Sequence, residues 1–242
     1  MYKALALYLI VLGALGLAVC WSPLAWLTPV SLLALLAGTI WLWRAEGHSV
    51  TELGLQRPAL WCRKILWGLL MGLGLPIVLI AVQVGGGWIT LTPAFGTAGN
   101  SLKVVLLSVG KTALIAAVEE LIFRGYFLQR FTLNLRVRLA VLLSSLLWAI
   151  MHLPDMLASG LYPLQLAIGI ATFSLIGAAL GIGFLYNNKT LWLPFGLHCG
   201  YNVGYSLIGS LTAVTYHAPT WWAGHPAWSP ESGLSGLLLA GV

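Results

Sequence analysis

Residues 101–127, SLKVVLLSVGKTALIAAVEELIFRGYF, form an apolar run that few charged side chains interrupt. The run exceeds the roughly 20 residues that an α-helix needs to cross the hydrocarbon core of a bilayer. Backbone polar groups in that core must be paired within the segment, so a spanning run of this length is a helix. The chain of 242 residues is 60% hydrophobic and only 7% charged, which leaves too little polar surface for a water-soluble globule. The sequence therefore predicts an all-α, polytopic transmembrane helical bundle.

Apolar runs of similar length on both sides of this stretch predict seven membrane spans in total. The predicted spans are residues 4–20, 24–43, 64–84, 102–127, 138–153, 163–187 and 190–212. The first run follows Lys3 as in a signal peptide, but no small-residue cleavage site stands out, so we expect an uncleaved span.

The tail 213–242 contains Trp221, Trp222 and Trp228 among prolines and glycines, a composition typical of the membrane interface. Its apolar end, residues 234–242, is too short to cross the bilayer unaided, so the bundle has seven spans, or eight if this end inserts. No linker, internal repeat or low-complexity tract divides the chain. We therefore expect a single integral membrane domain over residues 1–242.

The positive charges lie between the apolar runs and indicate how the chain is oriented. The connection between the second and third spans contains Arg44, Arg57, Arg63 and Lys64, and the connections at 85–101 and 154–162 contain no Lys or Arg. By the positive-inside rule, the basic connections and the N-terminus are cytoplasmic. The net charge of +6 thus reflects topology, and we expect no nucleic-acid partner. A multi-pass protein of a bacterial-type inner membrane or plasma membrane fits this pattern.

Two of only six acidic residues, Glu119 and Glu120, stand together inside the quoted run. A carboxylate at membrane depth is costly and usually serves a function. Arg124 lies four residues after Glu120 on the same helix face, so an ion pair between them would offset part of the burial cost. Glu119 points about 100° away and is left without that partner. We expect this unpaired carboxylate to be able to take a proton from water.

Two further pairs of side chains share helix faces at a similar membrane depth. Trp148 and His152 are four residues apart in one predicted span, and His198 and Asn202 are four apart in another. At about 1.5 Å per residue, Glu119, His152, His198 and Asn202 lie about 12 to 22 Å from the cytoplasmic ends of their helices. The four side chains can therefore meet near the middle of the bilayer if the helices tilt modestly.

Three short motifs resemble those of a known protease family. EELIFRG, WAIMH and HCGYN resemble the ordered motifs EExxxR, FxxxH and HxxxN of the CAAX-protease and bacteriocin-processing (CPBP, or ABI) family of intramembrane endopeptidases. ELGLQRP, just before a predicted span, is similar to another element of that family. The resemblance covers about residues 50–212, and its one departure is Trp148, which stands where the motif has Phe and keeps an aromatic wall.

The resemblance implies a glutamate-dependent intramembrane endopeptidase that acts on membrane-embedded or lipid-anchored protein or peptide tails. It implies that Glu119 activates the attacking water with the help of His152, and that His198 and Asn202 hold the oxyanion or orient the water. Glu120 and Arg124 would pair structurally. The rival interpretation is a non-catalytic transport, immunity or scaffold protein that keeps the polar cluster for packing or ligand binding.

The residues leave open whether a metal takes part. Two histidines, a glutamate and an amide can equally furnish a Zn²⁺ site, with Glu119, His152 and His198 as the candidate ligands. The chain has no HExxH motif, so the spacing of the common zinc proteases gives no support. We favour a mechanism without a cofactor and keep zinc as the alternative.

Overall fold

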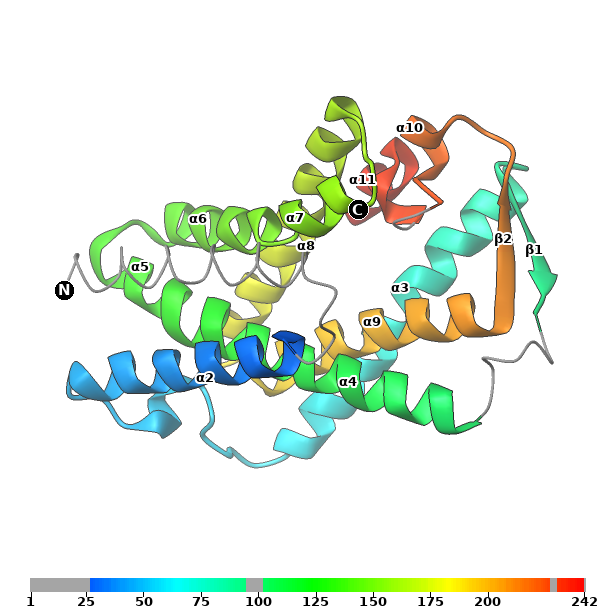
Figure 1. Ribbon diagram of the computed structural model, residues 1–242. Helices are drawn as coiled ribbons and strands as arrows, with labels where there is room; N and C mark the ends of the chain where they lie inside the picture. The colour runs from blue at the N-terminus through cyan, green and yellow to red at the C-terminus, as the bar shows by residue number, and fades with distance from the viewer. Residues whose placement is uncertain (1–26, 95–101, 227–229, 242) are drawn as a thin grey trace.

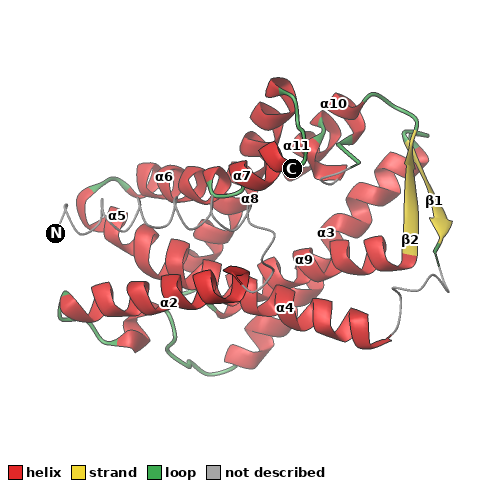
Figure 2. Ribbon diagram, viewed as in Figure 1, coloured by secondary structure: helices red, strands yellow, loops and turns green. Residues whose placement is uncertain are grey.

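A computed structural model describes residues 27–94, 102–226 and 230–241 of the chain (Figure 1). Helices dominate it (Figure 2), so the predicted helical bundle is confirmed. The helical elements are α2 Leu27–Ala45, η1 Val50–Leu53, α3 Trp61–Gly85, α4 Leu102–Glu120, the π-helix η2 Leu121–Leu128, α5 Gln129–Asn134, α6 Val137–Ile150, α7 Leu153–Ala158, α8 Pro163–Tyr186, α9 Trp192–Leu211, α10 Thr220–Ala223, η3 Pro230–Ser232 and α11 Leu234–Ala240.

Three helical stretches of the described residues are long and apolar enough to cross a membrane: Trp61–Gly85, Val137–Ala158 and Pro163–Tyr186. They support an integral membrane protein. The larger count of seven or eight spans stays a prediction, and its first span, 4–20, lies outside the described residues. The predicted span 102–127 is helical but includes charged side chains, and its α-helix ends at Glu120, where the π-helix begins.

A short two-stranded β-sheet, absent from the sequence prediction, lies at one end of the molecule. Strand β1 (Ile89–Pro93) pairs antiparallel with β2 (Thr212–Tyr216), with Ile89 opposite Tyr216 and Pro93 opposite Thr212. Both segments are rich in β-branched residues but extend over only five positions. Such short strands lie in connections that hydropathy alone marks as loops, which is why the all-α expectation missed them.

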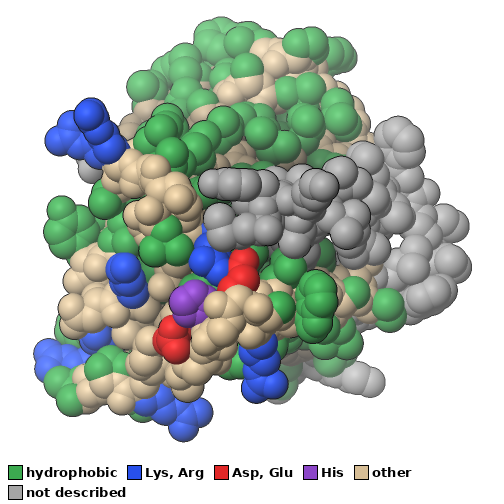
Figure 3. All heavy atoms as spheres, turned by 90° about the vertical axis from the view of Figure 1, so that its left-hand side faces the viewer, with side chains coloured by type: hydrophobic (Ala, Val, Ile, Leu, Met, Phe, Trp, Pro, Cys, Tyr) green, Lys and Arg blue, Asp and Glu red, His purple; other side chains and the backbone are tan. Residues whose placement is uncertain are grey.

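The opposite end of the molecule is rich in basic side chains. Arg44 lies in the last turn of α2, and Arg136 immediately precedes α6. The C-terminal end of α2 and the junction of α5 with α6 lie at the same end of the molecule, away from the β-sheet (Figure 1). Figure 3 shows several Lys and Arg side chains on this face. Two of the positions that the sequence assigns to cytoplasmic connections, Arg44 and Arg136, therefore lie at one end of the protein.

Glycines allow α3 and α9 to pack closely, and α9 carries two of the predicted site residues. A Cβ atom on Gly72 of α3 would overlap the Leu197 carbonyl of α9, and one on Gly200 of α9 would overlap the Leu69 carbonyl of α3. Small residues at membrane-helix interfaces permit this backbone approach. The α3–α9 packing thus fixes the position of α9, and with it the position of His198.

The tail folds back onto the bundle. Gln83 of α3 is fully buried and its amide nitrogen donates to the carbonyl oxygens of Ala223 (3.1 Å) and Pro230 (3.3 Å) and to the Ser235 hydroxyl (2.9 Å). Helix α11 also packs against α8. The tail predicted at the membrane interface is therefore attached to the bundle through these contacts, while Trp228 lies outside the described residues.

Candidate active site

The helix that carries the two adjacent glutamates changes its geometry directly after them. Helix α4 ends at Glu120, and the next eight residues form the π-helix η2. π-helical turns are rare and often occur at functional sites. Gly125 in η2 packs against η1, where an added Cβ atom would lie 2.6 Å from the Leu53 carbonyl oxygen. Leu53 belongs to the ELGLQRP segment, so the beginning of this segment packs against the π-helix that follows the two glutamates.

Glu120 and Arg124 form the ion pair that the sequence predicts. The Arg124 Nη1 group donates to Glu120 Oε1 at 2.8 Å, and both side chains are almost completely buried. Arg124 Nη2 also donates to the Gly177 carbonyl oxygen of α8 at 3.1 Å. The pair therefore links the site helix to α8 as well as neutralising a buried charge.

His198 contacts both glutamates: its approach to Glu119 was predicted from the sequence, and its hydrogen bond with Glu120 was not. Its Nδ1 lies 2.9 Å from Glu120 Oε1, and its Nε2 lies 3.7 Å from Glu119 Oε2. Since the carboxylate paired with Arg124 acts as an acceptor, the proton of the shorter contact belongs on Nδ1. The Nε2 atom then faces Glu119 and can accept or carry a second proton there.

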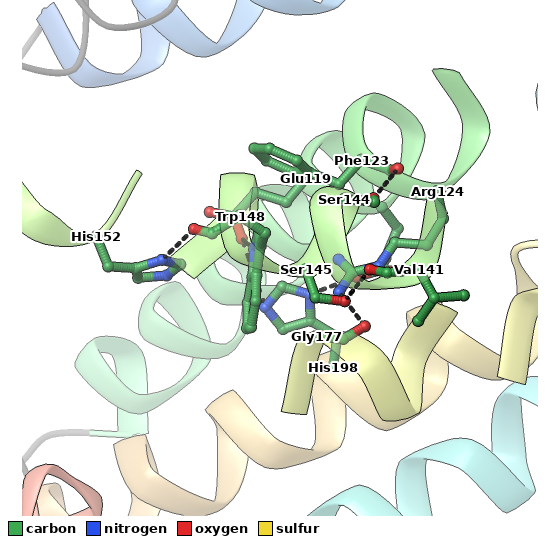
Figure 4. A network of polar contacts seen from close by, with 11 residues as sticks. Glu119, Phe123, Arg124, Val141, Ser144, Ser145, Trp148, His152, Gly177 and His198 are labelled. Atoms are coloured by element: carbon green, nitrogen blue, oxygen red, sulfur yellow. Dashed lines mark hydrogen bonds and ion pairs between the residues drawn. The ribbon is translucent and has the colours of Figure 1, made fainter. Parts of the chain in front are cut away.

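Glu119 is the more accessible of the two carboxylates. Its side chain is 21% exposed, whereas that of Glu120 is fully buried. The indole Nε1 of Trp148 donates to Glu119 Oε2 at 2.7 Å (Figure 4). The predicted aromatic wall at position 148 is therefore also a hydrogen-bond donor. Glu119 combines a fixed orientation with access to solvent, which are the properties that a base for water requires.

His152 lies on the other side of the Trp148 ring from His198 (Figure 4). Its Nδ1 is 2.9 Å from the Trp148 carbonyl oxygen, and its ring stacks on Phe173 with centroids 4.5 Å apart. A carbonyl oxygen only accepts, so Nδ1 carries the proton of this bond. In the neutral ring, Nε2 is then the basic nitrogen.

Of the predicted residues, Glu119, Glu120, Arg124, Trp148 and His198 are in mutual contact, and His152 adjoins them through Trp148. Asn202 lies one turn beyond His198 on α9, partly exposed, and its side chain makes no hydrogen bond within the described residues. Its role stays a prediction. No three His, Cys, Asp or Glu side chains in the described ranges are arranged to hold a metal ion.

Comparison with known proteins yields one match. Residues 101–204 match a family model described as type II CAAX prenyl endopeptidase Rce1-like. The matched range includes all the predicted site residues and agrees with the family resemblance of the three motifs. None of the curated proteins and none of the solved structures compared with the chain matches it. The helical segment 101–204, which carries the two glutamates, the two histidines and the arginine of the site, is therefore similar to the Rce1-like type II CAAX prenyl endopeptidases.

Proposed function

We propose that the protein is an intramembrane endopeptidase in which Glu119 activates the water that hydrolyses a peptide bond. The observation that carries this proposal is the placement of the Glu119 carboxylate, which is partly exposed and lies between the Trp148 indole N–H and His198 Nε2. Amide hydrolysis needs a base for water and donors at the oxygen where negative charge develops. The site offers both kinds of group on one side of α4.

In the proposed reaction, Glu119 takes a proton from water as the water oxygen attacks the peptide carbonyl carbon. The carbonyl oxygen becomes an oxyanion, for which His198, carrying a proton on Nε2, and the Asn202 amide are the proposed donors. The carbon–nitrogen bond then breaks, and the proton held by Glu119 passes to the leaving nitrogen. His152 assists through its basic Nε2. Glu120 and Arg124 hold His198 and the helix in place.

The proposed substrates are the tails of membrane-embedded or lipid-anchored proteins or peptides. The family model that matches residues 101–204 names CAAX prenyl endopeptidases, which makes a prenylated C-terminal tail the first candidate. The three long apolar helices support a position in the bilayer, where such a tail would be anchored. The proposed orientation has the N-terminus and the basic end of the bundle in the cytoplasm, within a bacterial-type inner or plasma membrane.

A mechanism without metal is part of the proposal. It is supported by the arrangement of the described residues, among which no three His, Cys, Asp or Glu side chains are grouped as metal ligands. Zinc held by Glu119, His152 and His198 is the alternative and would supply a Lewis acid at the same water. Metal analysis of the purified protein, with chelator treatment before an activity assay, separates the two mechanisms.

The non-catalytic interpretation has one observation in its favour. The network of Glu120, Arg124, His198 and the Gly177 carbonyl is buried and would stabilise any helical bundle. A comparison of membrane proteomes from cells with the wild type and with Glu119→Gln tests the two functions. The endopeptidase predicts new protein C-termini that appear only with the wild type. Identical C-termini in both samples, at equal protein levels, would support the non-catalytic function.

A further inference from the structure

Trp148 contacts four side chains of the candidate site. Its indole donates to Glu119, and the Arg124 guanidinium carbon lies 5.0 Å from its ring centroid. The rings of His152 and His198 lie edge-on to it, with centroids 4.9 and 5.4 Å away. The side chain is 2% exposed, so these contacts are sheltered from water.

The hydrogen bond to Glu119 has a specific chemical consequence. It occupies Oε2, the same oxygen that lies 3.7 Å from His198 Nε2, so it orients the carboxylate toward that histidine and leaves Oε1 for water. A hydrogen bond to a charged group is stronger than one between neutral groups. A carboxylate fixed in this way loses less freedom when it meets the reacting water.

The backbone of the same residue fixes a second group. The Trp148 carbonyl oxygen accepts the Nδ1 proton of His152, which orients the ring and leaves Nε2 as its basic nitrogen. A phenylalanine, which the resembling motif has at this position, keeps this carbonyl contact but has no indole N–H. Tryptophan at position 148 can therefore hold both the Glu119 carboxylate and the His152 imidazole, whereas phenylalanine could hold only the imidazole.

We infer that Trp148 is a positioning residue: its indole N–H holds the Glu119 carboxylate in its reactive orientation. The catalytic consequence of this contact rests on the proposed function. Trp148→Phe isolates this role because it removes the N–H and keeps an aromatic ring and the carbonyl contact to His152. A tryptophan analogue with sulfur in place of the indole N–H, introduced at position 148, is a second variant of nearly unchanged shape.

Two measurements on the purified full-length chain test the inference. The first is cleavage of a quenched fluorescent farnesylated CAAX peptide in bicelles. For both variants we expect kcat to fall by about 10- to 100-fold, with KM changed by less than about twofold, because a hydrogen bond to a charged group is lost and no substrate contact is removed. The second is a thermal double-mutant cycle of Trp148→Phe with Glu119→Leu, in which the Tm losses should be clearly less than additive.

Trp43→Phe is the matched control. Trp43 is 4% exposed, donates its indole N–H to the Ser49 carbonyl oxygen at 2.8 Å, and has the Arg130 guanidinium 5.2 Å from its ring centroid. This variant should lower Tm and leave kcat unchanged. An unchanged kcat in both position 148 variants, or additive Tm losses in the cycle, would overturn the inference. If the Tm losses in the cycle are less than additive but the wild type does not cleave the peptide, the Trp148–Glu119 contact is supported and the proposed function is not.

Discussion

Replacing Arg124 by methionine tests how the buried charges of the site are balanced. The substitution keeps an unbranched apolar side chain but removes the Nη1 bond to Glu120 (2.8 Å), the Nη2 bond to the Gly177 carbonyl (3.1 Å) and the cation–π contact with Trp148. Glu120, which is fully buried, would keep His198 as its hydrogen-bonding partner. The variant therefore leaves a carboxylate inside the bundle without its cationic partner.

The expected cost follows from the burial of both partners. Breaking a buried ion pair by removing one partner destabilises proteins by about 3–5 kcal/mol. In a chain of this size each kcal/mol lowers Tm by about 2–4 °C, so Arg124→Met should lower Tm by on the order of 10 °C. Adding Glu120→Gln removes the stranded charge, and the glutamine Oε1 can still accept the His198 Nδ1 proton. The double variant should therefore recover most of the lost stability.

The assay is thermal unfolding of the purified protein in detergent, followed by intrinsic tryptophan fluorescence. Arg130→Met is the matched control, because Arg130 also pairs with a glutamate, Glu46, and lies over a tryptophan but is more exposed. This pair is only partly buried, so its loss should cost less than the loss of the Arg124 pair. A Tm for Arg124→Met within about 2 °C of the wild type, or a double variant no more stable than the single one, would refute this account of the charges.

Three further variants test contacts that lie outside the reacting groups. Gly125→Ala places a methyl group against the Leu53 carbonyl, so we expect a loss of about 1–3 kcal/mol in thermal unfolding, and an unchanged Tm would contradict the close packing. Hydrogen bonds from Ser49 lower the pKa of Glu52 from its ordinary value, so the stabilising contribution of this carboxylate is present above its ordinary pKa and is lost as the pH falls through the folded-state pKa. The difference in Tm between the wild type and Glu52→Gln should accordingly shrink as the pH is lowered. A difference in Tm that does not change with pH would show that ionised Glu52 does not stabilise the fold. Gln83→Leu removes the donor to the tail, so limited proteolysis should cut the tail faster than in the wild type; equal rates would show that other contacts hold it.

The parts of the structure that depend on local spacing could be predicted from the sequence. The helical bundle follows from long apolar runs, and the Glu120–Arg124 pair follows from the four-residue repeat of a helix face. Even the different environments of Glu119 and Glu120 follow from the angle of about 100° between adjacent helix positions.

The contacts between helices could not be predicted in the same way. The bond from Trp148 to Glu119 and the bond from His198 to Glu120 join residues 29 and 78 positions apart, and they depend on how whole helices rotate against each other. The π-helix after Glu120 adds a local change of helical pitch that a regular helical repeat does not contain. One sequence feature did indicate the bond from Trp148 to Glu119. Tryptophan stands where the motif has phenylalanine, and a buried indole N–H usually finds an acceptor.

The most direct test of the central claim is the single-turnover cleavage rate of Glu119→Gln on the farnesylated peptide, compared with the wild type and with Glu52→Gln as an exposed control. Loss of the base should slow cleavage by at least about 100-fold, while Tm stays close to that of the wild type and the control retains full activity. Cleavage by Glu119→Gln at the wild-type rate would contradict the claim that this carboxylate activates the attacking water.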